Sequence, residues 1–243
     1  MELWSNSECQ NILGFLGYGS PAAPLWLIGQ EEGLGGKMPH AEQVRNLRNR
    51  GKWKSIMDLS EAHMTLTEDG SPIDISKPRK GSTAVWLWMS RIARAYEGQS
   101  DWNKLDLARH YMRTRLGRRE DGQTFMTELS PVAKKELGEG SWLRELLSQP
   151  NADQYLKHRE RSLRNLLQVH QPKMVVCYGT TGKAKFAHLL GLKEWLAISP
   201  TVSISSSGNH FLLPYFGQGQ KTNENVETLV NSDGFQRLAK RES

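Results

Sequence analysis

The chain has 243 residues, enough for a substantial core, and carries 32 Lys and Arg against 26 Asp and Glu, a formal net charge of +6. This basic balance modestly favours a nucleic-acid partner, and the lack of any apolar run of membrane-spanning length excludes an integral membrane protein. Because Cys9 and Cys177 are far apart and cannot build a disulfide framework or a four-cysteine zinc site, we expect a soluble cytoplasmic protein without a metal.

The first 21 residues predict a short helix followed by a break. Residues 5–16 have a helical pattern, with Ser5 or Asn6 as N-cap, and residues 17–21, GYGSP, then interrupt regular structure. These glycines offer a GxG pattern. A dinucleotide-binding fingerprint must follow a strand and open a helix, so this segment does not predict one.

The first predicted strand leads into a polar loop bounded by glycines. The apolar run Leu25–Ile28 is typical of a strand buried on both faces of a parallel sheet. It is followed by GQEEG, residues 29–33, at a strand end where open α/β sheets place their ligand sites. Two adjacent carboxylates and an amide at this position predict a site. The alternative is a loop whose acids cap the next helix.

The region up to residue 129 predicts helices, an exposed segment and a second strand. These elements are a basic helix over 41–59 interrupted at Gly51, an exposed loop over 67–82, an apolar helix over 83–96 and an arginine-rich helix over 105–116. The arginines of the last helix are either a solvated helix face or a track for phosphates. Residues 123–129 alternate as a strand does, and Glu128 is a second acidic residue at a strand end.

The C-terminal half completes an α/β pattern. Its predicted elements are an amphipathic helix over 155–169, a strand over 173–179, a hairpin over 202–205 and 210–216, and a helix over 224–238. GTTGK, residues 179–183, does not match the GxxxxGK[ST] spacing of an NTPase, although a helix start with Lys183 and Lys185 can bind a single phosphate. Without repeats or linkers, the chain predicts one domain, residues 1–243, with three α/β/α layers.

Four features, in this order, resemble the uracil-DNA glycosylase superfamily. They are a buried strand ending in a polar GxxxG loop, a polar residue ending a middle strand, a VVCYG strand leading into a helix, and a last strand followed by a small-residue loop. The superfamily's first loop reads GQDPY, GEAPG or GINPG, where this chain has GQEEG. The resemblance spans most of the chain. It implies a central, mostly parallel four-stranded sheet, DNA as partner, a monomer and no cofactor.

The resemblance also implies roles for individual residues. Glu31 aligns with the Asp of GQDPY and is the candidate for activating water or stabilising the positive charge on the sugar, with Glu32 as reserve and Gln30 assisting. The base must first be flipped out of the DNA stack into a pocket within a basic groove. Further candidates are Glu128, Tyr215, Phe216 and His210 for contacts to the base, and Gly217, Gln218, Gly219, Lys183 and Lys185 for contacts to DNA.

Two departures from the family pattern bear on the substrate. Glu128 replaces an asparagine that often reads the uracil edge, and PYFGQG, residues 214–219, replaces the late HPS motif, with His210 four residues before Pro214. A carboxylate accepts hydrogen bonds only, so it repels O4 of uracil and accepts from the N4 amino group of cytosine. We therefore expect a monofunctional DNA glycosylase that removes a modified cytosine, hydroxymethylated or glucosylated. Phage DNA contains such bases, so this activity would suit a bacterial enzyme of phage defence.

Two alternatives to this function remain. One is excision of uracil, and the other is a non-catalytic DNA-binding module that has kept the fold without the HPS element. A hydrolase of another class has little support, because the sequence contains no GxSxG elbow, no HExxH motif and no cluster of His and Cys that would bind a metal.

Overall fold

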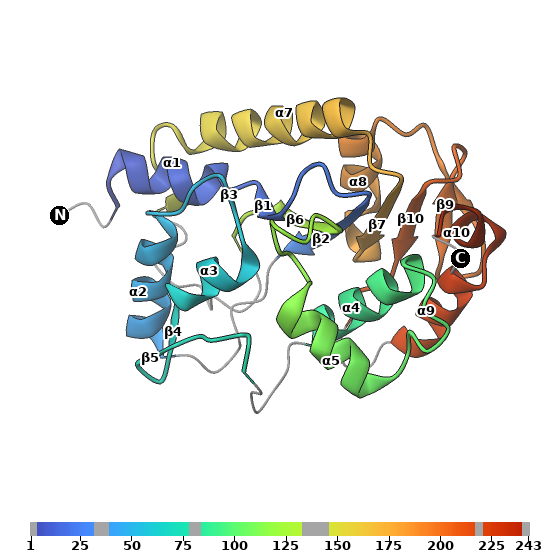
Figure 1. The fold of residues 1–243 in the computed structure, drawn as a ribbon. Coiled ribbons are helices and arrows are strands. Elements are labelled where there is room, and N and C mark those ends of the chain that lie inside the picture. Colours follow the sequence, from blue (N-terminus) through green and yellow to red (C-terminus); the bar gives the residue numbers. More distant parts are fainter. Residues whose placement is uncertain (1–3, 32–38, 78–83, 133–145, 217–220, 240–243) are drawn as a thin grey trace.

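The computed structural model describes residues 4–31, 39–77, 84–132, 146–216 and 221–239, and eight of its strands form one sheet between helices (Figure 1). In spatial order these strands are β3 (Ile56–Met57), β1 (Gly17–Gly19), β6 (Thr124–Ser130), β2 (Leu25–Glu31), β7 (Met174–Tyr178), β10 (His210–Leu213), β9 (Ser203–Ser205) and β8 (Trp195–Ala197). A separate ribbon of β4 (Thr67–Glu68) and β5 (Ser71–Pro72) lies in the segment that we predicted to be a loop.

The four central strands, β6, β2, β7 and β10, are parallel to one another, whereas β1 pairs with β6 in the antiparallel direction. The predicted α/β class with a mostly parallel sheet is therefore confirmed, but the predicted number of four strands is too small. The segment Gly17–Gly19, which we expected to break the chain, pairs with β6 on one side and with β3 on the other. At the opposite edge, β9 and β8 extend the sheet with antiparallel pairs.

Helices cover both faces of this sheet (Figure 1). Trp26 and Ile28 of β2 face α7 (Ala152–His170) and α8 (Lys183–Leu190). Leu25 and Leu27 alternate with them and face the opposite layer, which includes α4 (Ala84–Tyr96) and α9 (Thr222–Val230). Both kinds of side chain are fully buried, which explains why this strand has a continuous apolar sequence. The further helical elements are α1 (Asn6–Gly14), α2 (His40–Arg50), α3 (Leu59–Met64), α5 (Leu105–Thr114), the 3-10 turn η1 (Thr180–Gly182) and α10 (Asp233–Leu238).

Local sequence signals account for several helix ends. Ser5 and Glu8 form a capping box at the start of α1, which confirms Ser5 as the N-cap. The predicted single helix over 224–238 is wrong, because Ser232 caps a new helix by accepting a hydrogen bond from the backbone N–H of Phe235. Within the described segments, no helix combines the length and apolar character needed to cross a membrane.

Candidate functional site

The carboxyl ends of the central parallel strands bring together polar residues that are distant in the sequence. Residue Gly29 of β2 pairs with Glu128 of β6, and Tyr178 ends the strand on the other side of β2. The segment that connects β2 to β6 along the chain includes α4, which packs on one face of the sheet. The segment that connects β6 to β7 includes α7, which packs on the other face. The strand order thus reverses beside β2, and open α/β sheets bind their ligands at such a point.

Glu128 and Tyr178 meet directly above Gly29. The Tyr178 hydroxyl donates a hydrogen bond of 2.6 Å to Oε1 of Glu128. A Cβ atom at residue 29 would lie 1.8 Å from Oε2 of Glu128 and 2.3 Å from the Tyr178 hydroxyl. The absence of a side chain at Gly29 therefore allows the carboxylate of β6 to reach the tyrosine of β7 across the strand between them.

The ring of Tyr178 connects this carboxylate to the loop after β10. It stacks on Phe216, with ring centroids 4.8 Å apart and planes at 20°, and the ring of Tyr215 lies 6.3 Å away. Phe216 is buried, whereas Tyr215 is 39% exposed. Of the two aromatic residues predicted to contact a base, Tyr215 is accessible to a ligand and Phe216 supports Tyr178 from within the core.

Gln30 extends the site towards the start of α8. Its Oε1 accepts a hydrogen bond from the hydroxyl of Thr181, in the turn that precedes this helix. Gly179 joins β7 to that turn with φ = 104°, and a Cβ there would lie 3.1 Å from Oε1 of Gln30. Lys183 and Lys185 are exposed in the first turn of α8, so their ammonium groups are accessible close to this edge of the sheet.

Some predicted site residues cannot be described in full. The backbone of Glu31 ends β2 opposite Ser130, which puts it at the same edge as Glu128, but its side chain is outside the described part of the chain. Glu32, Gly217, Gln218 and Gly219 lie outside the described residues altogether.

His210 is not brought together with the other predicted base contacts. It begins β10 opposite Val175, whereas the site lies level with Tyr178 and Leu213, roughly 10 Å further along the strands. Its Nδ1 lies 3.2 Å from the hydroxyl of Ser205, and burial lowers its pKa to about 4. A groove of about 520 Å³ lies at this amino end of the strands, lined by Arg164, Leu167, Gln168, Gln171, Pro172, Lys173, Leu189, Leu190, Gly191, Asn209 and His210.

Sequence reasoning missed two residues of the site, Tyr178 and Arg159. Arg159 is only 3% exposed and donates from Nη2 to the backbone carbonyl of Glu128 at 2.7 Å. A signal was present, because residues 156, 159, 163 and 167 share the helical spacing of the apolar face of α7. A charged side chain on that face indicates a buried polar contact. Tyr178, at the end of an apolar strand, offers no comparable signal.

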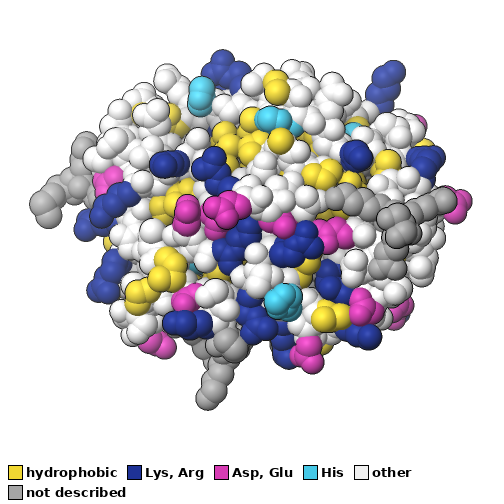
Figure 2. All heavy atoms as spheres, in the orientation of Figure 1, with side chains coloured by type: hydrophobic (Ala, Val, Ile, Leu, Met, Phe, Trp, Pro, Cys, Tyr) yellow, Lys and Arg dark blue, Asp and Glu magenta, His cyan; other side chains and the backbone are white. Residues whose placement is uncertain are grey.

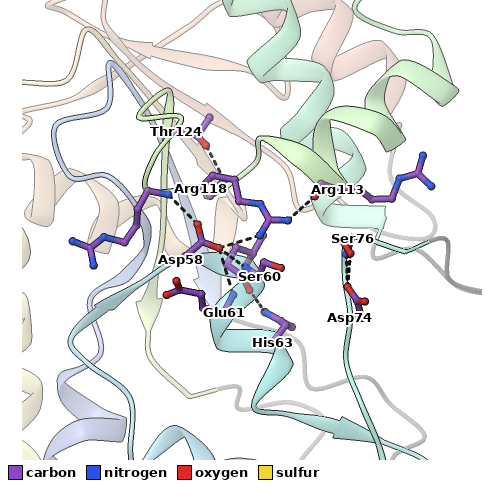
Figure 3. Close-up of polar contacts among 12 residues, drawn as sticks. Asp58, Ser60, Glu61, His63, Asp74, Ser76, Arg113, Arg118 and Thr124 are labelled. Atoms are coloured by element: carbon purple, nitrogen blue, oxygen red, sulfur yellow. Dashed lines mark hydrogen bonds and ion pairs between the residues drawn. The ribbon is translucent and has the colours of Figure 1, made fainter.

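Two of the arginines that follow α5, Arg115 and Arg118, form ion pairs within the protein. Figure 3 shows Arg118 between α3 and the end of α5, and its Nη1 donates to Oδ1 of Asp58 at 3.0 Å. Asp58 also caps α3 by accepting from the backbone N–H of Ser60. Lys and Arg side chains gather between α3 and α5 on the face shown in Figure 2, with acidic side chains among them. For Arg118, and for Arg115, which pairs with Glu97 and Asp121, a structural role is favoured over a phosphate track.

Comparisons of this chain with protein-family models, with curated proteins and with solved structures find no match. Among the described residues, no group of three or more His, Cys, Asp and Glu side chains could hold a metal ion. The site is thus defined by its own chemistry: a carboxylate, a phenol, an amide and an exposed aromatic ring at the reversal point of a parallel sheet.

Proposed function

We propose that this protein is a DNA glycosylase of the uracil-DNA glycosylase type, which flips a non-standard pyrimidine out of DNA and hydrolyses its N-glycosidic bond. The observation that carries the proposal is that Glu128 and Tyr215 meet around Tyr178 at the carboxyl ends of β6 and β10, while Gln30 lies at the end of β2 and bonds to Thr181. These residues come from distant segments of the chain, and the carboxyl ends of parallel strands are where an α/β sheet binds its ligands.

The proposed reaction needs a carboxylate and a water molecule. Glu31 is the proposed catalytic carboxylate, with Glu32 as its alternative. The bond from the sugar C1′ to the base nitrogen breaks, and its electron pair leaves with the base. The water oxygen bonds to C1′, and the water proton goes to the carboxylate. An abasic site and a free base are the products, and no cofactor is required.

Glu128 and Tyr215 are the proposed contacts to the base. The Tyr178 hydroxyl donates to Oε1, as expected for a carboxylate acting as acceptor. An acceptor here favours an amino group at C4 of the pyrimidine over a keto group, so a modified cytosine is the preferred substrate. The exposed ring of Tyr215 is available to stack on the flipped base. Gln30 would bond to the base or orient the water, and Lys183 and Lys185 would contact phosphates.

The test is base release from duplexes that contain one uracil, cytosine, 5-hydroxymethylcytosine or glucosylated 5-hydroxymethylcytosine. We expect abasic sites on a modified cytosine, and at least about a hundredfold loss of rate in Glu31→Gln. Glu194→Gln, an exposed glutamate before β8, is the matched control and should retain the wild-type rate. Release of uracil alone would contradict the modified-cytosine substrate.

A non-catalytic DNA-binding module is the second candidate. It is favoured by the segment that replaces the HPS motif, where Phe216 is buried against Tyr178 and offers no polar group to a departing base. DNA binding that survives in Glu31→Gln and in Glu32→Gln, with no base released by the wild-type protein from any of the four duplexes, would select this candidate.

A further inference from the structure

Arg159 is a buried cation that holds the end of β6 from the face opposite to Glu128. Its Nε donates to the carbonyl of Phe15 at 2.5 Å, Nη1 to the carbonyl of Leu129 at 3.2 Å, and Nη2 to the carbonyl of Glu128 at 2.7 Å. Nη2 also lies 3.3 Å from the hydroxyl of Thr127. One guanidinium thus fixes the last residues of β6, the strand that carries Glu128, the candidate contact to the base.

In the described part of the chain, the negative charge that acts on this guanidinium is that of Glu128. Carbonyl and hydroxyl oxygens satisfy its donors, and within the described residues no Asp or Glu forms an ion pair with it. Burial lowers the pKa of Arg159 to about 10, and the negative charge of Glu128 acts in the opposite direction. Because such an interaction is reciprocal, the guanidinium favours the ionised form of Glu128 as much as the carboxylate favours the charged guanidinium.

We propose that Arg159 is a positioning residue that determines specificity, because it keeps Glu128 in the carboxylate form and so offers the base an acceptor only. This inference rests on the proposed glycosylase function. Within the described residues, Arg159 of α7 contacts the backbone carbonyl of residue 128, and Tyr178 of β7 contacts its carboxylate. Arg159 supplies the positive charge, and Tyr178 supplies a neutral hydrogen bond.

The protonation state of Glu128 decides which base edge fits. As a carboxylate it accepts from the amino group at C4 of a cytosine-type base. As a carboxylic acid it gains an O–H donor and can bond to the keto oxygen at C4 of uracil. Loss of the charge at residue 159 should therefore shift the preference of the site from amino-bearing towards keto-bearing pyrimidines.

The first experiment follows the titration of Glu128 by NMR and needs no activity. The side-chain carboxyl ¹³C signal is assigned with Glu128→Gln and titrated in the wild type, Arg159→Gln, Arg159→Lys and the control Arg161→Gln. Arg161 is exposed two residues further along the same helix. We expect the midpoint to rise by at least about one pH unit in Arg159→Gln and to stay within about half a unit in the other two variants. An unchanged midpoint in folded Arg159→Gln would overturn the proposal.

A second measurement covers the case in which Arg159→Gln does not fold. Glu128→Gln removes the counter-charge and leaves the buried guanidinium in place, so it should unfold at a lower urea concentration than Glu194→Gln. Equal stability of these two variants would also overturn the proposal.

Base selectivity completes the test. In Arg159→Gln, the ratio of excision of the modified cytosine to excision of uracil should fall by about tenfold, the equivalent of one pH unit of titration. An unchanged ratio would overturn the specificity role. A shifted titration in a protein that releases no base from any duplex would support the coupling of Arg159 with Glu128 and contradict only the glycosylase function.

Discussion

At the scale of single residues, position 29 shows how much the candidate site depends on a missing side chain. Only a hydrogen atom fits between the backbone of β2 and the contact that joins Glu128 to Tyr178. Gly29 and Tyr178 are buried and Glu128 is half-buried, so neither Glu128 nor Tyr178 can move aside without losing packing contacts. Gly29 is therefore a structural condition of the site even though it carries no functional group.

Replacement of Gly29 by Ala should disrupt this arrangement. The new Cβ would overlap Oε2 of Glu128, and we expect a loss of about 1 to 3 kcal/mol in the free energy of unfolding, together with the loss of the proposed base binding. Urea denaturation measures the first effect. Gly14→Ala is the matched control, because a Cβ at Gly14 meets no atom within 4 Å, and it should leave stability unchanged or slightly higher. An equal response of the two variants would argue against the tight contact at Gly29.

At the scale of elements, α7 contacts the site through Arg159, which donates to the backbone carbonyl of Glu128. The backbone just after this helix is strained. Gln171, the residue after the end of the helix, lies in the left-handed region with φ = 44°, where most helices that end in this way have glycine.

Gln171→Gly should therefore stabilise the protein. We expect a gain of about 0.5 to 1 kcal/mol in the free energy of unfolding, because relief of the left-handed strain exceeds the added entropy of the unfolded chain. The matched change Gln168→Gly, in the last turn of the same helix, should cost about 1 kcal/mol. Thermal unfolding of both variants measures the difference, and destabilisation by Gln171→Gly would show that its side chain makes a contact worth more than the strain.

Some strands of the sheet could be predicted from the sequence and others could not. Apolar runs located β2 and β7 because strands buried on both faces leave a continuous pattern. β3 and β8 have two and three residues, too few for any periodicity, so these two strands were not predicted. The number of four strands came from the resemblance to the superfamily. Glu128 was found because it is an acidic residue near the end of a predicted strand. Its contacts with Tyr178 and Arg159 depend on strand register and on helix packing, which a single sequence does not specify.

At the scale of the whole molecule, the net charge of +6 makes salt the simplest probe of a nucleic-acid partner. If the protein binds DNA, the logarithm of the affinity should fall linearly with the logarithm of the salt concentration. Each of Lys183→Gln and Lys185→Gln should reduce that slope by about one, because each removes one phosphate contact. Lys193→Gln, in the exposed segment before β8, is the control and should leave the slope unchanged. Binding that is insensitive to salt would contradict contacts between these lysines and phosphates.

The position of β2 between β6 and β7 also has a consequence for synthesis of the protein on the ribosome. The two strands that pair with β2 are β6, which ends at Ser130, and β7, which ends at Tyr178. The edge of β2 that pairs with β7 therefore stays unpaired until 178 − 31 = 147 further residues have been translated. At roughly 5 to 20 residues per second, this exposure lasts about 7 to 30 s. The apolar residues of β2 are then accessible to other nascent chains, so the yield of folded protein should depend on chaperones that bind extended apolar segments.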